Sequence, residues 1–305
     1  MRGMDGLILV RKPVSATSHD VVAALRNILD QPKIGHFGTL DPLASGLLVA
    51  AAGKATRLFP FYAKLDKIYE GRIRLGFSTD TYDADGRPTS PESSDYPAQA
   101  AVQDGLRRFE GEIVQVPPPY SAKKVDGKPL YVYARRQTPV QGRPFQVRVE
   151  AFRLRRYDPP FIEFEVLCGS GTYIRALAHD LGQALGCGAH LAGLIRTGIG
   201  EFRLEDASTL EQIRDFHGSG SPAAFLRPME TVLPSWPRID LDEEGVRLVR
   251  NGLPVAPGRI AASNGLSGRP ADPQAGVRLF GPDGRLIALA KPGACPGQFA
   301  PFLVL

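Results

Sequence analysis

The amino-acid sequence predicts an α+β protein with a small β-rich C-terminal domain. Apolar residues follow the helical period between Val21 and Leu29 and again from Ile174 to Leu185, whereas segments 69–77 and 162–166 alternate as half-buried strands do. Past about residue 234 the chain consists of short apolar runs separated by glycine and proline. Helical and strand segments followed by a strand-rich tail are typical of the α+β class.

Composition places the chain among ordinary globular proteins. Its 305 residues are 43% hydrophobic and 23% charged, which argues against a disordered, collagenous or membrane-embedded chain. The longest uncharged stretch near the N-terminus, 42–53, is too short to cross about 30 Å of hydrocarbon. We expect no signal peptide, because Arg11 and Lys12 directly follow the apolar run 7–10. Three isolated cysteines favour a reducing, cytoplasmic location.

The first expected elements are a strand and a capped helix. The apolar run 7–10 predicts a buried strand that ends at Lys12-Pro13. Thr17 or Ser18 can cap a helix that continues to residue 29. Residues 35–53 are expected to form a loop and then an apolar element.

The middle of the chain is expected to mix strands, loops and helices. We predict a strand over 69–77, a loop over 80–97, a helix over 98–109, a break at prolines 117–119, a strand through 162–166 and a helix from about Thr172 to Gly186. The turn Gly169-Ser170-Gly171 fits a phosphate contact and a tight strand-to-helix connection equally well. In the tail, strands are expected over 277–280, 286–290 and 302–305, and a mobile loop over 261–276.

The charge is unevenly distributed. The whole chain carries +5, but ten cations and two anions between Tyr120 and Arg156 give that basic strip +8 and leave −3 for the remainder. Tyr120, Tyr131, Tyr133 and Phe145 are interleaved with the cations, as in proteins that pair phosphate contacts with base stacking. By itself the basic strip is equally compatible with a solvated basic face.

No motif supports a metal site. Residues 81–92 match a calcium-binding EF-hand loop except at its first position, but Pro88 and Pro91 lie inside it and a strand-like segment precedes it. The five histidines have no ligand spacing such as H-E-x-x-H. We therefore expect neither a metal nor a cofactor.

Asp41 has unusual surroundings for an acidic residue. It lies in the glycine-containing run 35–46, directly before Pro42, which favours an extended backbone at Asp41. Neighbouring leucines would partly desolvate its carboxylate, which is costly unless a cation pairs with it. Spacing alone leaves open a turn or cap residue and a functional carboxylate.

The run GHFGTLDPLASGLL, residues 35–48, closely resembles the catalytic motif of the TruB family of bacterial tRNA pseudouridine synthases. Other family motifs are matched in the same order over about residues 5–205, at 9–13, 67–69, 79–86, 120–124, 130–135, 171–175 and 186–191. The resemblance implies a central mixed, mainly antiparallel β-sheet flanked by helices and loops. It also implies a catalytic domain over 1–232, an RNA-gripping thumb at about 117–146 and a PUA-like RNA-binding domain over 233–305.

The resemblance further implies the activity and the site residues. The family converts uridine-55 of the tRNA T-loop to pseudouridine by base eversion, cleavage of the glycosidic bond, rotation of the uracil and reattachment through C5. Asp41 would start the cleavage, Arg175 would pair with it and Tyr69 would stack on the target base. Further matches are the substrate-binding positions His36, Tyr173, Leu194 and Lys12, and the RNA-binding positions Lys123, Lys124 and Arg135. Phe37 departs from the family, which often has threonine or another small residue there.

Two other functions remain open on the sequence. One is a tRNA-folding chaperone that acts mainly by binding the tRNA elbow, and the other is a subunit of a guide-RNA-dependent pseudouridine synthase. The preferred interpretation is a stand-alone enzyme that needs no protein partner, acts on the tRNA T-stem-loop as a monomer and does not associate with a membrane.

Overall fold

The computed structural model describes residues 3–138, 140–264 and 276–305. The chain divides into two compact units, one formed by residues 8–51 and 56–225 and the other by residues 1–7, 52–55 and 226–305. The larger unit holds the predicted catalytic loop and the basic strip. No helix of the described residues is long and apolar enough to cross a membrane.

Local signals account for the first elements. Strand β1 (Gly6–Lys12) is followed by helix α1 (Ser18–Leu29). The Thr17 hydroxyl accepts a hydrogen bond from the Asp20 N–H, and the Asp20 carboxylate accepts one from the Thr17 N–H. This capping box satisfies two backbone donors, which explains why the helix begins at the predicted place. Helix α1 packs against α6 (Leu210–Gly218).

Among the elements that follow, the predicted strand over 69–77 and helix over 98–109 are found, and the apolar element expected before residue 53 is a strand, whereas the strands at 34–36 and 111–115 and the short helices over 53–62 were not predicted. In chain order, these elements are β2 (Ile34–His36), β3 (Ala44–Ala52), the short helices η1 (Gly53–Leu58) and α2 (Phe59–Tyr62), β4 (Lys67–Leu75), α3 (Gln99–Arg107) and β5 (Gly111–Gln115). The thumb region contains β6 (Lys124–Val125), β7 (Lys128–Pro129) and α4 (Leu130–Arg135). After it come β8 (Phe145–Asp158), β9 (Phe161–Cys168), α5 (Ile174–Ala184), β10 (Ala189–Ile199) and β11 (Phe202–Arg203).

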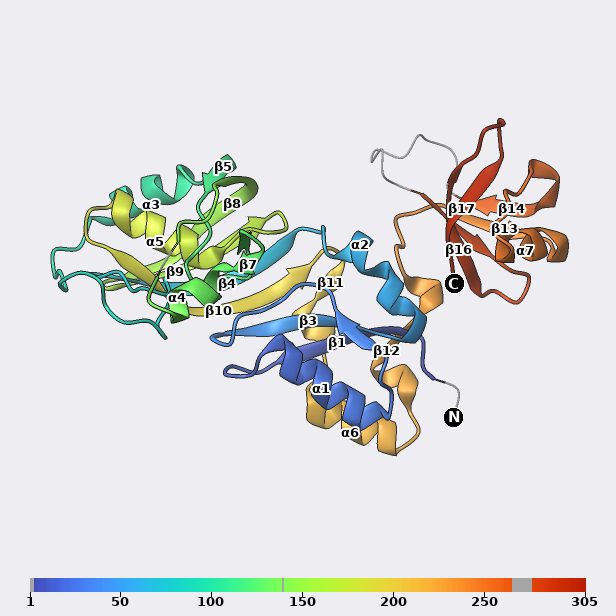
Figure 1. The fold of residues 1–305 in the computed structure, drawn as a ribbon, viewed down its shortest axis with the longest axis horizontal. Helices are drawn as coiled ribbons and strands as arrows, with labels where there is room; N and C mark the ends of the chain where they lie inside the picture. The colour runs from blue at the N-terminus through green and yellow to red at the C-terminus, as the bar shows by residue number, and fades with distance from the viewer. Residues whose placement is uncertain (1–2, 139, 265–275) are drawn as a thin grey trace. The chain divides into compact units, whose positions relative to one another are not determined.

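The predicted central sheet is confirmed. Its strands follow the order β1-β3-β10-β4-β9-β8-β5 (Figure 1). Neighbours from β10 to β5 are antiparallel, whereas β3 and β10 are parallel, so the sheet is mixed and mainly antiparallel. Leu106 of α3 and Leu177 of α5 share a core with Ile73, Phe164 and Val166, which places both helices over one face of the sheet.

The smaller unit contains the predicted β-rich tail. Its five-stranded sheet has the order β14-β13-β15-β16-β17. The strands are β13 (Arg238–Leu241), β14 (Ile260–Asn264), β15 (Val277–Phe280), β16 (Leu286–Pro292) and β17 (Phe299–Val304).

Two features of this unit differ from the sequence expectation. Residues 261–264, expected in a loop, lie in β14 because they pair with β13, and residues 265–275 of that predicted loop lie outside the described part. Helix α7 (Glu243–Arg250) was not expected in the tail. Half of its eight residues are charged, and it contributes only Val246 and Val249 to the apolar core, which is too few for its period to stand out in the sequence.

Candidate active site

Asp41 lies in the loop between β2 and β3, and its side chain is 43% exposed. Ser18, at the start of α1, stabilises this loop next to Asp41 through two hydrogen bonds. The Ser18 hydroxyl donates to the Leu40 carbonyl at 3.2 Å and accepts from the Leu40 N–H at 2.8 Å. The residue before Asp41 is therefore bonded through both backbone groups, which restricts where the carboxylate can lie.

Arg175 meets Asp41 from the first turn of α5. It is 5% exposed, and its Nε lies 2.9 Å from Asp41 Oδ2. The Nε–H has no hydrogen-bond acceptor among the residues that the structure describes, so this contact is an ion pair without a directed hydrogen bond. The other guanidinium nitrogens donate to the carbonyls of Thr81, at 2.9 Å, and Tyr120, at 3.2 Å. Arg175 thus joins the Asp41 loop to two segments that are distant in sequence.

A second carboxylate, Asp83, also faces Arg175, and the sequence did not single it out as a site residue. Its Oδ2 lies 3.4 Å from Arg175 Nη1, and its side chain is 7% exposed. Burial raises the pKa of Asp83, while a hydrogen bond from Thr81 and the charge of Arg175 oppose that rise. The signal in the sequence was the acidic segment 81–92, which fitted an EF-hand pattern. In the structure, Asp83 is the buried acid of that segment, and it belongs to an Asp41–Arg175–Asp83 network.

Tyr69 is on β4 opposite Arg196 of β10, and it is 8% exposed. Burial raises the pKa of its hydroxyl, and the nearby Arg196 charge opposes part of that rise. The phenol therefore stays protonated at neutral pH, as a stacking surface with a hydroxyl donor. Tyr69 belongs to the same apolar core as Leu40 and Leu194.

Arg196 supports the loop that carries Asp41, and no pattern in the sequence indicated this. It is 1% exposed, and its Nε donates to the Leu47 carbonyl at 2.8 Å. Its two terminal nitrogens contact the carbonyls of Gly38, at 3.0 Å, and Thr39, at 3.4 Å. These bonds hold the chain on both sides of Asp41. Arg196 and Gly38 are 158 residues apart in the sequence, so local sequence patterns could not predict that they are bonded.

Two lysines are also buried beneath this loop. Lys12 is 0% exposed, and its ammonium donates to the carbonyls of Pro13 and Ala16 at 2.9 and 2.6 Å. Lys67 is 5% exposed and donates to the carbonyls of Ala63 and Leu65 at 2.7 and 2.6 Å. Burial lowers the pKa of both. Lys12 was predicted to bind substrate. Its two hydrogen bonds to backbone carbonyls favour a role in stabilising the turn after β1.

Lys67 makes stability depend on pH in a defined direction. Burial, reinforced by Arg196, lowers the pKa of Lys67 from 10.5 to about 8. The unfolded chain therefore binds this proton more tightly, and between pH 8 and 10.5 unfolding becomes less favourable as pH rises. From pH 8 to 9.5 we expect wild type to gain about 2 kcal/mol in unfolding free energy relative to Lys67→Met. Urea titrations of both proteins at several pH values measure this difference, and parallel curves would contradict it.

The remaining predicted substrate positions lie around the network. His36, on β2, is half-buried, and burial lowers its pKa, so it is neutral at pH 7. Tyr173 precedes α5, and its backbone exchanges two hydrogen bonds with the Gln115 amide, at 3.0 and 3.2 Å. Burial raises the pKa of the Tyr173 hydroxyl. Leu194 pairs with Ala44 across β10 and β3 and is 8% exposed.

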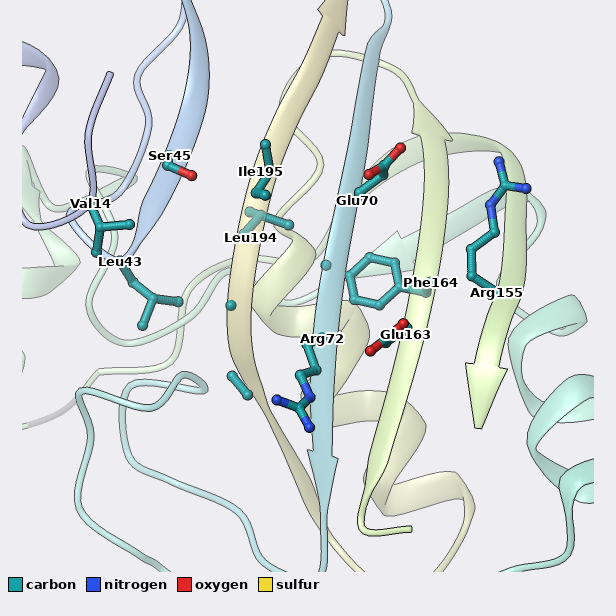
Figure 2. Close-up of a pocket in the computed structure, with 13 residues that line it drawn as sticks. Val14, Leu43, Ser45, Glu70, Arg72, Arg155, Glu163, Phe164, Leu194 and Ile195 are labelled. Carbon is teal, nitrogen blue, oxygen red and sulfur yellow. The ribbon is translucent and has the colours of Figure 1, made fainter. Parts of the chain in front are cut away.

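A cavity of about 490 Å³ lies over β10, β4 and β9 (Figure 2). Of the predicted site residues only Leu194 lines it. Glu70 and Arg72, which also line it, alternate with Tyr69 along β4 and therefore point to the opposite face of the sheet. The cavity is thus separate from the Asp41–Arg175–Asp83 network.

The basic strip divides into two parts. Four of its arginines lie on β8 and form ion pairs with Asp66, Glu150, Glu165 or Asp158: Arg148, Arg153, Arg155 and Arg156. In contrast, Lys123, Lys124 and Arg135 form no ion pair with any residue that the structure describes. Lys123 Nζ lies 4.2 Å from the centre of the Phe145 ring, and Arg135 Cζ lies 5.4 Å from that of Tyr131. The charge available to an anionic ligand is therefore concentrated in the thumb.

Neutralising Lys123, Lys124 and Arg135 together should weaken binding to the tRNA that the family resemblance implies, and the salt dependence of that binding. If each contacts one phosphate, the slope of log K against log salt should flatten by about 2 to 3. Filter binding between 50 and 300 mM salt would measure this slope. As a matched control, neutralising the paired Arg153, Arg155 and Arg156 should change the slope much less. Equal slopes for wild type and the thumb variant would show that the thumb is not the RNA footprint.

Comparison with known proteins agrees with the geometry. Residues 26–174 match the N-terminal domain of the TruB family pseudouridylate synthases, and residues 175–234 match the tRNA pseudouridylate synthase B C-terminal domain. The chain is 43% identical over 258 residues to tRNA pseudouridine synthase B of Solibacter usitatus, covering 84% of this chain and 88% of that one. It is 42% identical over 303 residues to the protein of that name from Burkholderia mallei, covering 98% and 96%.

Solved structures extend the likeness to the whole fold. The chain resembles a protein in an H/ACA RNP bound to a substrate RNA containing 2′-deoxyuridine, with 26% identity and a TM-score of 0.73. It also resembles a protein in a Cbf5-Nop10-Gar1 complex, with 28% identity and a TM-score of 0.73. Both matches cover 98% of this chain and 84% of the other. With its central sheet and both family domains in place, this chain belongs to the TruB family of pseudouridine synthases.

Proposed function

We propose that this protein isomerises uridine-55 of the tRNA T-loop to pseudouridine. The observation that carries the proposal is the Asp41–Arg175 ion pair, in which a buried cation holds a half-exposed carboxylate. Arg175 would hold Asp41 in place and offset its charge when RNA displaces water from the site. A neighbouring buried tyrosine, Tyr69, would offer a face on which a base can stack.

The reaction needs the target uridine to leave the RNA stack, at a cost of a few kcal/mol. Asp41 would then act as nucleophile or base to break the bond between C1′ and N1, and the freed uracil would rotate and rejoin through C5. The C5 proton is lost and N1 gains one, so substrate and product are isomers. No oxidant, reductant or donated group is consumed. Tyr69, Tyr173 and Leu194 would hold the base during rotation.

The surrounding residues would serve RNA binding. Lys123, Lys124 and Arg135 of the thumb would contact phosphates, and His36, whose pKa burial lowers, would contact the RNA around the everted base. The β-rich tail would act as a PUA-like RNA-binding domain. We place the enzyme in the cytoplasm, acting as a monomer without a protein partner.

Sequence identities to two groups of proteins bear on whether this protein depends on a guide RNA. The proteins named tRNA pseudouridine synthase B are 43% and 42% identical to this chain, whereas the proteins from the RNP complexes are 26% and 28% identical. The closer relatives favour a stand-alone enzyme. An RNA chaperone, the other alternative, would not need a buried arginine to hold a carboxylate beside its ligand.

Tritium release from unmodified tRNA labelled at C5 of uridine tests the proposal, since C5 loses its hydrogen only if the bond to C1′ moves. The purified chain alone should release one tritium per tRNA. A tRNA with cytidine at position 55 should release none. No release from the first substrate, or equal release from both, would overturn the proposed activity or its position.

A further inference from the structure

One side of helix α5 carries three residues that contact the loop segment 78–83. Arg175, His179 and Gln183 are spaced four residues apart, so they lie on one side of the helix. Arg175 binds this segment through the contacts described above. Near the C-terminal end of the helix, the Gln183 amide donates a hydrogen bond to the Ser78 hydroxyl at 3.0 Å. The helix that supplies Arg175 therefore contacts this segment from its first turn to its last.

His179 is in the middle of this row, and its ring stacks on Tyr82. The ring centres are 3.8 Å apart and the ring planes differ by 9°. The backbone of Tyr82 has a φ of 67°, in the left-handed region that an aromatic residue rarely adopts. Such a conformation persists only where the surrounding contacts hold it. The stack on α5 is therefore one of the contacts that keep Tyr82 in place.

Asp83 directly follows Tyr82, so the conformation at Tyr82 decides where the Asp83 carboxylate points. The Tyr82 carbonyl accepts a hydrogen bond from the Leu191 N–H at 3.0 Å, and the Ala84 N–H donates to the Leu191 carbonyl at 2.9 Å. These two bonds hold the backbone on both sides of Asp83, and the ring stack holds the Tyr82 side chain against α5. In this arrangement Asp83 Oδ2 lies 3.4 Å from Arg175 Nη1.

We propose that Tyr82 and His179 are a positioning pair for the reaction. Their stack holds Asp83 beside Arg175 and thereby sets where the guanidinium meets Asp41. The proposal rests on the proposed function, in which Asp41 starts the reaction. Neither ring belongs to the ion-pair network, so the effect on the reaction passes through the Asp83 carboxylate. A misplaced reacting group costs about 10²-fold in rate, and we expect a smaller loss, about tenfold, from a pair that acts through another residue.

The substitution Tyr82→Leu tests the ring while keeping an apolar side chain at that position. The single-turnover rate of tritium release at saturating enzyme should fall about tenfold. The Kd for tRNA should stay within about twofold of wild type, because the thumb cations are untouched. Tyr82→Phe keeps the stack and should restore the wild-type rate. His179→Leu should match Tyr82→Leu, and His179→Phe, which retains a ring, should recover most of the rate.

Glycine at residue 82 separates loss of the ring from backbone strain. Because glycine adopts a positive φ readily, Tyr82→Gly removes the ring without forcing the loop into a new conformation. Its rate should also fall about tenfold. A rate within about threefold of wild type, in either Tyr82→Leu or Tyr82→Gly, would overturn the proposal.

An Asp83→Asn background tests whether the pair acts through Asp83. There Tyr82→Leu should lower the rate by less than about twofold, because the carboxylate that the stack positions is already gone. An equal fold loss in both backgrounds would overturn the proposal. The urea midpoints of the same four proteins require no activity. The destabilisation caused by Tyr82→Leu should be smaller in the Asp83→Asn background, and equal values would also contradict the proposal. Wild type that releases no tritium would overturn the proposed function instead, and the urea comparison would still test the stack.

Discussion

Asp41→Asn should abolish tritium release and leave tRNA binding nearly unchanged. The amide has the shape of the carboxylate but neither its charge nor its basicity, so cleavage of the glycosidic bond would lose the group that starts it. We expect the rate to fall about 10⁴-fold, the upper end of what one general acid or base contributes. The thumb cations and the Ser18 bonds to Leu40 are untouched, so both the RNA footprint and the loop position should survive.

Single-turnover tritium release with excess enzyme measures the first effect, and filter binding measures the second. Asp41→Glu is a useful companion, because it retains the charge but moves the carboxylate by one methylene. Release by Asp41→Asn above about 1% of the wild-type rate, equivalent to a loss under 3 kcal/mol, would show that another group starts the reaction.

Arg175→Met should reduce both activity and stability. It leaves the buried Asp83 carboxylate without its cation and removes the ion pair from Asp41. Breaking a buried ion pair from one side costs about 3 to 5 kcal/mol, and we expect unfolding free energy to fall by that amount. Activity should fall about 10²-fold or more, since a misplaced reacting group alone has that effect. Arg175→Lys should recover only part of it, because one ammonium cannot replace the guanidinium contacts.

A double substitution separates folding from catalysis. Adding Asp83→Asn to Arg175→Met removes the uncompensated buried charge, so the double variant should be more stable than Arg175→Met alone. Its activity should stay low, because Asp41 still lacks its partner. Urea titration and tritium release on the four proteins of this cycle measure both quantities. Recovery of activity together with stability would mean that Arg175 serves only the fold.

Local sequence signals predicted the elements well where they act over a few residues. Thr17 caps α1 through Asp20, only three residues away, and the alternation at 162–166 reflects one strand with one buried face. Helix α7 was missed because few of its residues are apolar. The tail segment 261–264 was expected in a loop because its pairing with β13 is not visible in its own composition.

The candidate site was predictable only in part. The family motifs pointed to Asp41, Tyr69 and Arg175, and the structure brings Asp41 and Arg175 into contact. The contributions of Asp83 and Arg196 were not predicted, because an acidic loop residue and an arginine in a strand are usually exposed. The net charge of the basic strip also could not reveal that the arginines of β8 are paired while Lys123, Lys124 and Arg135 are not.

The sequence by itself determined the α+β class, the elements with a clear apolar period, the family and the residues that match its catalytic motif, since these depend on short-range patterns. Only the tertiary structure decided which charges are buried and which partners they meet. Arg196 reaches Gly38 because β3 and β10 pair in parallel, and Arg175 reaches Asp41 and Asp83 because α5 packs over the sheet. Electrostatic interactions depend on distance and burial in space, and the separation of residues along the chain specifies neither.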